Sequence, residues 1–273
     1  MQIINFLYPE KSEIKYRIDT YPDSQSHLVL ESEIDRRKSL SIYTRLSNLN
    51  DIWILMQLAD ICHRQGIQIS FLRIAYLFAA RTDRLFSFNE ALDLELVKKC
   101  LTFVQADQIL ILDLHSKRLI TEGVIDNDWP TFFALEASSN IPENVLFPDE
   151  GAYHRYSELL DFNIKCRTTT YVATKHRISR DKLEVKLPSE IKPNTSILVF
   201  DDLCDGGGTF FAIHKALQDM GVTDVHLRVT HAIQKEPLVK LSKLYKTITI
   251  TNSYKDWDKE ELPNNIKVIR VYE

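Results

Sequence analysis

Short apolar runs alternate with segments of helical periodicity along almost the whole chain, and this alternation constrains the fold more than any other feature. The run Leu40–Leu46 predicts a strand, the segment Asp51–Gln65 predicts a helix, and Ile67–Tyr76 predicts the next strand. A helix over about Asn89–Val104 and a strand over Gln108–Leu114 continue the series. This order favours an α/β fold with mostly parallel sheets and helices on both faces.

The second half of the chain repeats this order, which predicts a second domain of the same class. Strands are expected over Val145–Phe147, Thr169–Thr174, Leu183–Leu187, Ser196–Asp201, Val225–His231, Thr247–Thr251 and Lys267–Tyr272, with helices after Gly151, up to Met220 and over Lys235–Leu244. The periodicity breaks between Pro130 and Pro142. We therefore expect two domains, residues 1–137 and 138–273, and the pattern also allows the last strand to return to the first domain.

Charge and composition exclude several classes of protein. The 34 Lys and Arg residues and 38 Asp and Glu residues leave a net charge of −4, which does not suggest a nucleic-acid surface. We expect no membrane span, because no run of about 20 apolar residues occurs, and no signal peptide, because no basic stretch precedes an apolar core. The cysteines are too far apart for a zinc site or a disulfide framework and are expected to be buried thiols of a soluble cytoplasmic protein: Cys62, Cys100, Cys166 and Cys204.

Glycine usage points to one loop. Three of the seven glycines are consecutive, at Gly206–Gly208, between an apolar strand and a helix. Backbone N–H groups, the helix N-terminus and the Thr209 hydroxyl would form a phosphate cradle there. Asp201 and Asp202 end the predicted strand, where open α/β sheets bind ligands, and suit sugar hydroxyls or hydrated magnesium. The Walker A and GxGxxG patterns are both absent.

The loop resembles the 5-phosphoribosyl 1-diphosphate (PRPP) binding loop of type I phosphoribosyltransferases and PRPP synthetases. Other segments resemble, in the same order, landmarks of the ribose-phosphate diphosphokinases: Tyr21–Gln25, Asn48–Met56, Ala80–Arg84, Asp113–Ser116, Phe147–Gly151, Thr174–Arg177, Thr230–His231 and Thr251–Ser253. Each piece is short, but together they span nearly the whole chain. The resemblance implies two phosphoribosyltransferase-like domains.

The resemblance also implies a reaction and a set of site residues. The β,γ-diphosphate of ATP would pass to the anomeric hydroxyl of a phosphorylated ribose, with release of AMP and with Mg²⁺ as cofactor. The implied ribose-phosphate ligands are Asp201, Asp202, Asp205, Gly206, Gly207, Gly208 and Thr209. The implied ATP ligands are Tyr21, Asp23, Gln25, Arg81 and Asp83, the magnesium-associated residues are His115 and Asp149, and the catalytic cations are Lys175 and Arg177.

Residue chemistry agrees with part of this assignment. Lys175 and Arg177 lie two residues apart, so on an extended strand they point the same way and could neutralise developing charge. Without the resemblance, the pair also fits a solvated strand end, and His115 alone would more often be structural. In the family, a neighbouring subunit completes the adenine pocket, so a homo-oligomer is implied.

The chain departs from the family pattern at the phosphate loop, where Gly206 replaces a common threonine. One hydroxyl is lost and space is gained, so the acceptor is either ribose 5-phosphate or ADP-ribose, whose ribose phosphate carries a further substituent. Thr82 and Gln25 also replace the family's glutamine and glutamate. Two alternatives remain open: a phosphoribosyltransferase that consumes PRPP, and a non-catalytic regulatory homologue.

Overall fold

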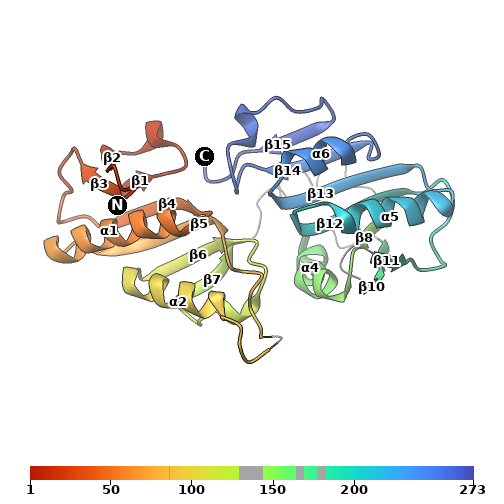
Figure 1. Ribbon diagram of the computed structural model, residues 1–273, viewed down its shortest axis with the longest axis horizontal. Helices are drawn as coiled ribbons and strands as arrows, with labels where there is room; N and C mark the ends of the chain where they lie inside the picture. Colours follow the sequence, from red (N-terminus) through yellow and green to blue (C-terminus); the bar gives the residue numbers. More distant parts are fainter. Residues whose placement is uncertain (86, 129–143, 164–168, 178–182) are drawn as a thin grey trace. The chain divides into compact units, whose positions relative to one another are not determined.

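The computed structural model describes residues 1–273 apart from 86, 129–143, 164–168 and 178–182. The chain divides into two compact units, Met1–Trp129 with Tyr272–Glu273, and Pro130–Val271 (Figure 1). The predicted domain boundary between Pro130 and Pro142 lies outside the described residues. Each unit is built on its own parallel sheet.

The sheet of unit 1 has five parallel strands in the order β1-β4-β5-β6-β7. Their bounds are Gln2–Asn5 for β1, Leu40–Leu46 for β4, Ile69–Leu77 for β5, Gln108–Leu112 for β6 and Ile125–Asp128 for β7. A separate antiparallel hairpin joins β2 (Tyr16–Thr20) to β3 (Ser26–Leu30). Neither this hairpin nor β7 was predicted from the sequence, and the four residues of β7 are too few to show a period of two.

Local signals explain the first helix, α1 (Leu49–Gln65). Asn48 accepts hydrogen bonds from the backbone N–H groups of Asn50 and Asp51, and the Asp51 carboxylate caps in return, which forms a capping box. The helix ends at Gly66, which has a φ of 67°, a left-handed conformation that suits glycine. Polar side chains thus cap the start of the helix and a glycine ends it, while its apolar face enters the core.

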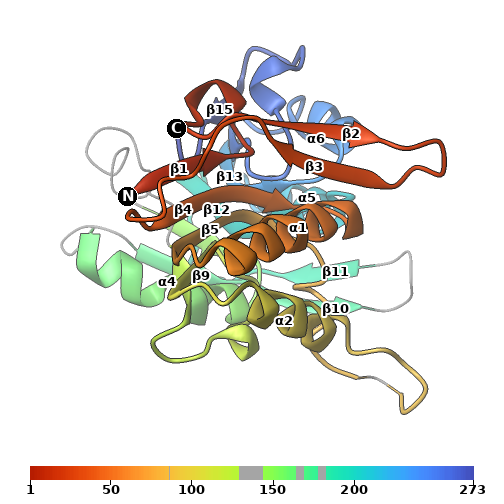
Figure 2. The ribbon, with the colours of Figure 1, turned by 90° about the vertical axis from the view of Figure 1, so that its left-hand side faces the viewer.

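All described helices of unit 1 that connect parallel strands lie on one face of its sheet, in front of the strands in Figure 2. Helix α1 packs against α2 (Asp93–Val104), and β3 packs against α1. Each new strand is added on the same side of the previous one, so right-handed crossovers bring every connection to the same face. For these described residues, the expectation of helices on both faces is therefore wrong.

The C-terminus joins unit 1. The Tyr272 hydroxyl donates a hydrogen bond to Asp128 at 2.7 Å, and the Arg73 guanidinium lies over the Tyr272 ring at 6.0 Å. Burial and the Asp128 carboxylate raise the pKa of Tyr272 well above its usual value. Tyr272 is therefore anchored to the first sheet by residues of β5 and β7.

Unit 2 holds six parallel strands in the order β15-β14-β13-β12-β8-β9. Their bounds are Asn144–Phe147 for β8, Thr169–Val172 for β9, Ser196–Cys204 for β12, Asp224–Ala232 for β13, Thr247–Thr251 for β14 and Ile266–Ile269 for β15. The predicted strand Thr169–Thr174 splits, because β10 (Thr174–Arg177) leaves the sheet to pair with β11 (Leu183–Lys186). The last strand does not return to unit 1, because β15 pairs with β14.

Helices cover both faces of the second sheet, as predicted. Tyr156 of α4 (Glu150–Asn163) stacks edge-on against Phe200 of β12 at 4.4 Å. Val199, the residue of β12 before Phe200, points to the opposite face of the sheet. There it packs in one hydrophobic core with Phe210 of α5 (Gly208–Asp219) and residues of α6 (Lys235–Leu241). The reason is the strand order: β12 to β15 are added in one direction, and β8 to β9 in the other.

The described cysteines differ in burial. Cys62 and Cys204 are buried free thiols, and burial raises the pKa of each to about 12, whereas Cys100 is only half-buried and Cys166 lies outside the described residues. Among the described residues, no helix combines the length and the apolar character that crossing a membrane requires.

Candidate active site

The strand order of unit 2 reverses between β8 and β12, and most of the predicted site residues of that unit lie at this point. Crevices outside the carboxyl ends of parallel strands form where the strand order reverses, because the flanking connections leave on opposite faces. Asp149 follows β8, and the glycine turn follows β12, which pairs directly with β8. In the described part of unit 1 the strand order never reverses.

The acidic pair lies within β12 and not after it. The strand continues to Cys204, because Asp201, Leu203 and Cys204 still pair with β13. Successive side chains of a strand point to opposite faces of the sheet. Asp202 therefore lies on the side of Phe200 and α4, whereas Asp201 shares the side of Val199 and α5. The two carboxyl groups still influence each other, because Arg155, the partner of Asp202, also acts on Asp201.

Asp202 forms a buried ion pair with a residue that the sequence analysis missed. The Arg155 guanidinium of α4 lies 2.7 Å from the Asp202 carboxylate, and their side chains are 12% and 4% exposed. Arg155 also lies 5.7 Å from the ring centre of Tyr156. Its position six residues after Asp149, near the start of the predicted helix, is a weak signal for this role, and strand pairing was needed to identify its partner.

The Asp201 side chain is half-buried, and its pKa is raised. Burial raises the pKa of this carboxyl well above its usual value, and the neighbouring Asp202 carboxylate raises it further, while Arg155 partly opposes the shift. The Asp149 carboxylate also raises the pKa of Asp201. Three carboxylates thus influence one another at the ends of β8 and β12, which makes this edge favourable for a cation.

Asp149 and Lys175 are brought together. The Lys175 ammonium of β10 lies 3.1 Å from the Asp149 carboxylate, which also accepts the Ala152 backbone N–H at 2.9 Å. Burial works to raise the pKa of Asp149, but these hydrogen bonds and the Lys175 charge hold it below its usual value. The side chain of Arg177 lies outside the described residues, although its backbone belongs to β10.

The glycine turn leads directly into α5. Gly207 has a φ of 74°, and a Cβ on it would meet Phe211 at 3.0 Å, Leu241 at 3.2 Å and Pro237 at 3.3 Å. A Cβ on Gly206 or on Gly208 would have no neighbour within 4 Å. Gly207 is thus required by the turn itself, whereas the outer glycines leave open space at the helix N-terminus.

The structure of unit 1 positions another group of the predicted residues. The Asp83 carboxylate accepts the Ser116 hydroxyl at 2.8 Å, and its carbonyl accepts from Arg118 at 2.7 Å. These bonds bring the segment after β5 against the segment after β6, next to half-buried His115. Arg81 is exposed on the same segment as Asp83. Arg81, Asp83 and His115 therefore belong to one edge of the first sheet.

The remaining predicted ATP residues, Tyr21, Asp23 and Gln25, form the turn of the β2–β3 hairpin. The Tyr21 side chain is 48% exposed, and the Gln25 backbone N–H donates to the Asp23 carboxylate at 3.1 Å. The hairpin is held on α1 by Gln57, which bonds Ser26 and Leu28. Figure 2 shows this turn projecting away from the sheet of unit 1.

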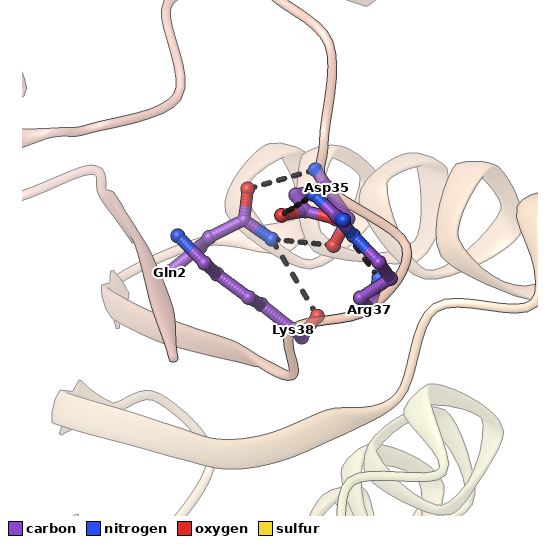
Figure 3. Close-up of polar contacts among 4 residues, drawn as sticks. All are labelled: Gln2, Asp35, Arg37 and Lys38. Carbon is purple, nitrogen blue, oxygen red and sulfur yellow. Dashed lines mark hydrogen bonds and ion pairs between the residues drawn. The ribbon is translucent and has the colours of Figure 1, made fainter.

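Unit 1 also contains a groove of about 1250 Å³ between β3, the segment after it and the C-terminal half of α1. At its rim, the Gln2 amide donates to the Asp35 carbonyl and accepts from the Asp35 backbone N–H, both at 2.9 Å, and Arg37 pairs with the Asp35 carboxylate (Figure 3). Acidic and basic side chains both line it, and it includes none of the predicted site residues.

The donor chemistry of these sites fits magnesium. Within the described residues, no group of three or more His, Cys, Asp and Glu side chains could hold a metal ion. Mg²⁺ is commonly bound by one or two carboxylates together with substrate phosphates and water, so it does not need such a cage. Asp149 supplies a carboxylate kept ionised by its neighbours, and His115 supplies an imidazole in the other unit.

Comparison with known proteins supports the resemblance. No family model matches the chain. The chain is 25% identical over 95% of its length to the ribose-phosphate pyrophosphokinase of Staphylococcus saprophyticus, of which it covers 86%. It is 26% identical to the enzyme of that name from Ureaplasma parvum, with 85% of the chain and 71% of the relative covered.

A solved structure shows the same fold. The phosphoribosylpyrophosphate synthetase of Mycobacterium smegmatis superimposes with a TM-score of 0.78 over 99% of this chain and 95% of that one, at 16% identity. The predicted α/β fold of mostly parallel sheets flanked by helices is thereby confirmed. The resemblance drawn from the collinear sequence segments is also confirmed by the curated relatives.

Proposed function

We propose that this chain, which resembles ribose-phosphate pyrophosphokinases in sequence and fold, is an ATP-dependent diphosphotransferase. The anomeric hydroxyl oxygen of a ribose 5-phosphate unit attacks the β-phosphorus of ATP. The bond from that phosphorus to the oxygen bridging it to the α-phosphorus breaks, AMP leaves with the bridging oxygen, and the hydroxyl proton is released. The product carries the diphosphate on C1 of the ribose.

The reversal of strand order in unit 2 is the observation that carries this proposal. It brings the ends of β8 and β12 together, so Asp149, Asp201 and the glycine turn share one edge. An anion-binding turn beside carboxylates is the chemistry that a phosphorylated sugar requires, since the turn takes the phosphate and the carboxylates take hydroxyls.

The acceptor would bind with its phosphate on the glycine turn. The open space at Gly206 and Gly208 allows phosphate oxygens to approach the backbone N–H groups at the start of α5. Thr209 would add its hydroxyl, and Asp205 borders the same turn. Asp201 and Asp202, whose carboxyl groups influence each other, would accept ribose hydroxyls.

Lys175 and Arg177 would stabilise charge on the transferred diphosphate and on the departing AMP. Phosphoryl-type transfer depends mainly on positioning and charge stabilisation, because the reacting groups are already activated. The hydrogen bond to Asp149 holds the Lys175 ammonium near the end of β8, which pairs with the strand that leads into the glycine turn.

ATP would be bound from unit 1. Arg81 and Asp83 lie beside His115 at one edge of the first sheet, where a guanidinium can pair with phosphate. Tyr21, Asp23 and Gln25 would contact adenine from the hairpin turn, contributed by a neighbouring subunit of a homo-oligomer. The exposure of Tyr21 agrees with a role outside its own unit.

Asp149 in unit 2 and His115 in unit 1 would each be associated with magnesium bound to substrate phosphates. When bound, it would supply charge neutralisation to the diphosphate being transferred. Asp149 is suited to this task because its carboxyl stays ionised below the usual pKa range. Lys175 shares that carboxylate in the chain as it stands, so the two cations would be close neighbours.

Two acceptors fit the site, ribose 5-phosphate and ADP-ribose. The open space at Gly206, where the family commonly has threonine, favours a phosphate that carries a substituent, as in ADP-ribose. The product would then be ADP-ribose 1-diphosphate, a precursor suited to rebuilding NAD. With ribose 5-phosphate, the product would be PRPP.

The test is an acceptor experiment with ATP and magnesium. The purified chain is incubated with ribose 5-phosphate or with ADP-ribose, and AMP release is followed together with the phosphorus NMR signal of the new C1 diphosphate. AMP release with either acceptor, and none without an acceptor, is the expected result. Turnover with ribose 5-phosphate but not ADP-ribose would remove the ADP-ribose role. No AMP with either acceptor would refute the proposed function.

A further inference from the structure

Gln234, which belongs to none of the predicted site segments, contacts the residue that begins the glycine turn. The Gln234 side-chain amide donates a hydrogen bond of 2.8 Å to the Asp205 carboxylate. Gln234 lies between the end of β13 and the start of α6, 29 residues after Asp205. Asp205 is the last residue before the three glycines, so its orientation determines what faces a ligand at the beginning of the turn.

The segment that carries Gln234 is itself firmly held. The Ile233 backbone N–H donates to the Cys204 carbonyl at 2.9 Å, which extends the pairing of β12 and β13 by one residue. On the other side, Leu238 of α6 is fully buried in the core of unit 2. The backbone of a residue between two such anchors has little freedom, so the exposed Gln234 side chain starts from a fixed point of the chain.

The same segment also fixes the centre of the turn. Pro237 and Leu241 lie so close to Gly207 that a Cβ there would meet them at 3.3 and 3.2 Å. Gly206 and Gly208 have open space around them. One short segment thus holds Asp205 and Gly207 while it leaves the two outer glycines clear for a ligand.

A neutral amide is well suited to this role. It donates a hydrogen bond to the Asp205 carboxylate without adding a charge to the turn. A lysine or arginine would bring a cation that competes for the phosphate, and a glutamate would repel Asp205. We propose that Gln234 is a positioning residue for acceptor binding, acting through Asp205 to preform the turn. The inference rests on the proposed function.

The experiment compares two substitutions, Gln234→Ala and Gln234→Glu, with the wild-type chain. Ribose 5-phosphate binding is measured by calorimetry, and kcat and the KM values for acceptor and ATP are measured with the better of the two acceptors. For Q234A we expect an acceptor KM raised about tenfold, equivalent to ~1.4 kcal/mol, with the KM for ATP unchanged. Alanine removes the bond without adding a charge.

Gln234→Glu gives a readout that a merely structural role would not move. Two carboxylates in contact repel when both are ionised and hold a proton between them at lower pH. We therefore expect the acceptor KM of Q234E to exceed that of Q234A at about pH 8.5 and to recover toward wild type near pH 6. The pH profile of Q234A should parallel that of the wild type.

The matched control is Lys240→Ala on α6, whose exposed partner is Glu236. It changes the charge of the same helix without touching the turn, so wild-type kinetics are expected. Wild-type acceptor KM in both Gln234 variants would overturn the inference, as would a rise in Q234E that does not depend on pH. A wild-type chain that neither binds acceptor nor releases AMP would instead refute the proposed function.

Discussion

The ammonium of Lys175 lies 3.1 Å from the carboxylate of Asp149. This pair joins β10, which has left the main sheet, to the segment that follows β8 inside it. The predicted catalytic cation Lys175 therefore has an anionic partner within its own unit. In the proposed reaction, a triphosphate would compete with Asp149 for this ammonium.

Replacement of Lys175 by alanine tests this relationship. Loss of a cation that stabilises developing charge should lower kcat about 10²–10³-fold, with a smaller effect on the KM for the acceptor. AMP release under saturating substrates provides the measurement. Lys186→Ala is the matched control, because Lys186 is an exposed cation on β11 opposite Thr174. Equal rates in both variants would contradict a catalytic role for Lys175.

The buried pair of Arg155 and Asp202 predicts a stability effect. Arg155→Met leaves the Asp202 carboxylate buried without its ionic partner, which should lower the free energy of unfolding by ~3–5 kcal/mol. The double variant Arg155→Met, Asp202→Asn should recover much of this loss, because the buried charge is removed as well. Urea unfolding followed by circular dichroism gives both values.

An exposed ion pair provides the comparison for that measurement. Arg64 and Asp60 are 63% and 56% exposed on α1, so Arg64→Met should change the unfolding free energy by less than about 0.5 kcal/mol. If Arg155→Met were equally mild, Asp202 would not depend on Arg155. A double variant as unstable as the single one would point instead to lost packing of the arginine stem.

The glycine turn predicts a difference between two neighbouring positions. Gly207→Ala places a Cβ on a residue with a φ of 74° and within 3.0 Å of Phe211, so we expect a loss of ~1–2 kcal/mol from the backbone conformation, plus the cost of displacing that ring. Gly206→Ala should be nearly neutral for folding, since its Cβ would meet nothing within 4 Å. The melting temperatures of both variants are measured by thermal unfolding. Equal shifts in the two melting temperatures would contradict this geometry of the turn.

Gly206 also allows a substitution toward the family pattern. Gly206→Thr restores the hydroxyl that commonly follows the loop aspartate and fills part of the open space. We expect it to lower the KM for ribose 5-phosphate and to raise that for ADP-ribose, each by about threefold to tenfold, as for one net hydrogen bond. Parallel assays with the two acceptors measure the ratio. An unchanged ratio would mean that Gly206 does not set acceptor choice.

Asp201 predicts a pH dependence of stability. Burial raises the pKa of this carboxyl in the folded chain, so the neutral form is favoured by folding. Its contribution is fully present below the unfolded pKa of about 3.9 and is lost as pH rises through the folded pKa. Asp201→Asn, which stays neutral, should therefore be more stable than wild type at neutral pH. Urea unfolding at several pH values should show that advantage shrinking as pH falls, and a constant advantage would contradict the shift.

Local patterns were sufficient for most of the secondary structure. The predicted strands Leu40–Leu46 and Thr247–Thr251 match β4 and β14, and the helix after the glycine turn matches α5. Apolar periodicity and capping residues are local signals, so no distant contact is needed to read them. The prediction missed β7, and it ended β12 three residues early, because pairing with β13 carries the strand past two charged residues.

The sequence by itself determined the types of element, the glycine turn and the chemistry available on either side of it. Tertiary structure alone decided the order of the strands, the side of β12 on which each aspartate lies, and the partners of Asp202 and Asp205. Arg155 and Gln234 lie 47 and 29 residues from those partners. Contacts over such separations depend on how the sheet assembles, and no local pattern in the chain encodes that assembly.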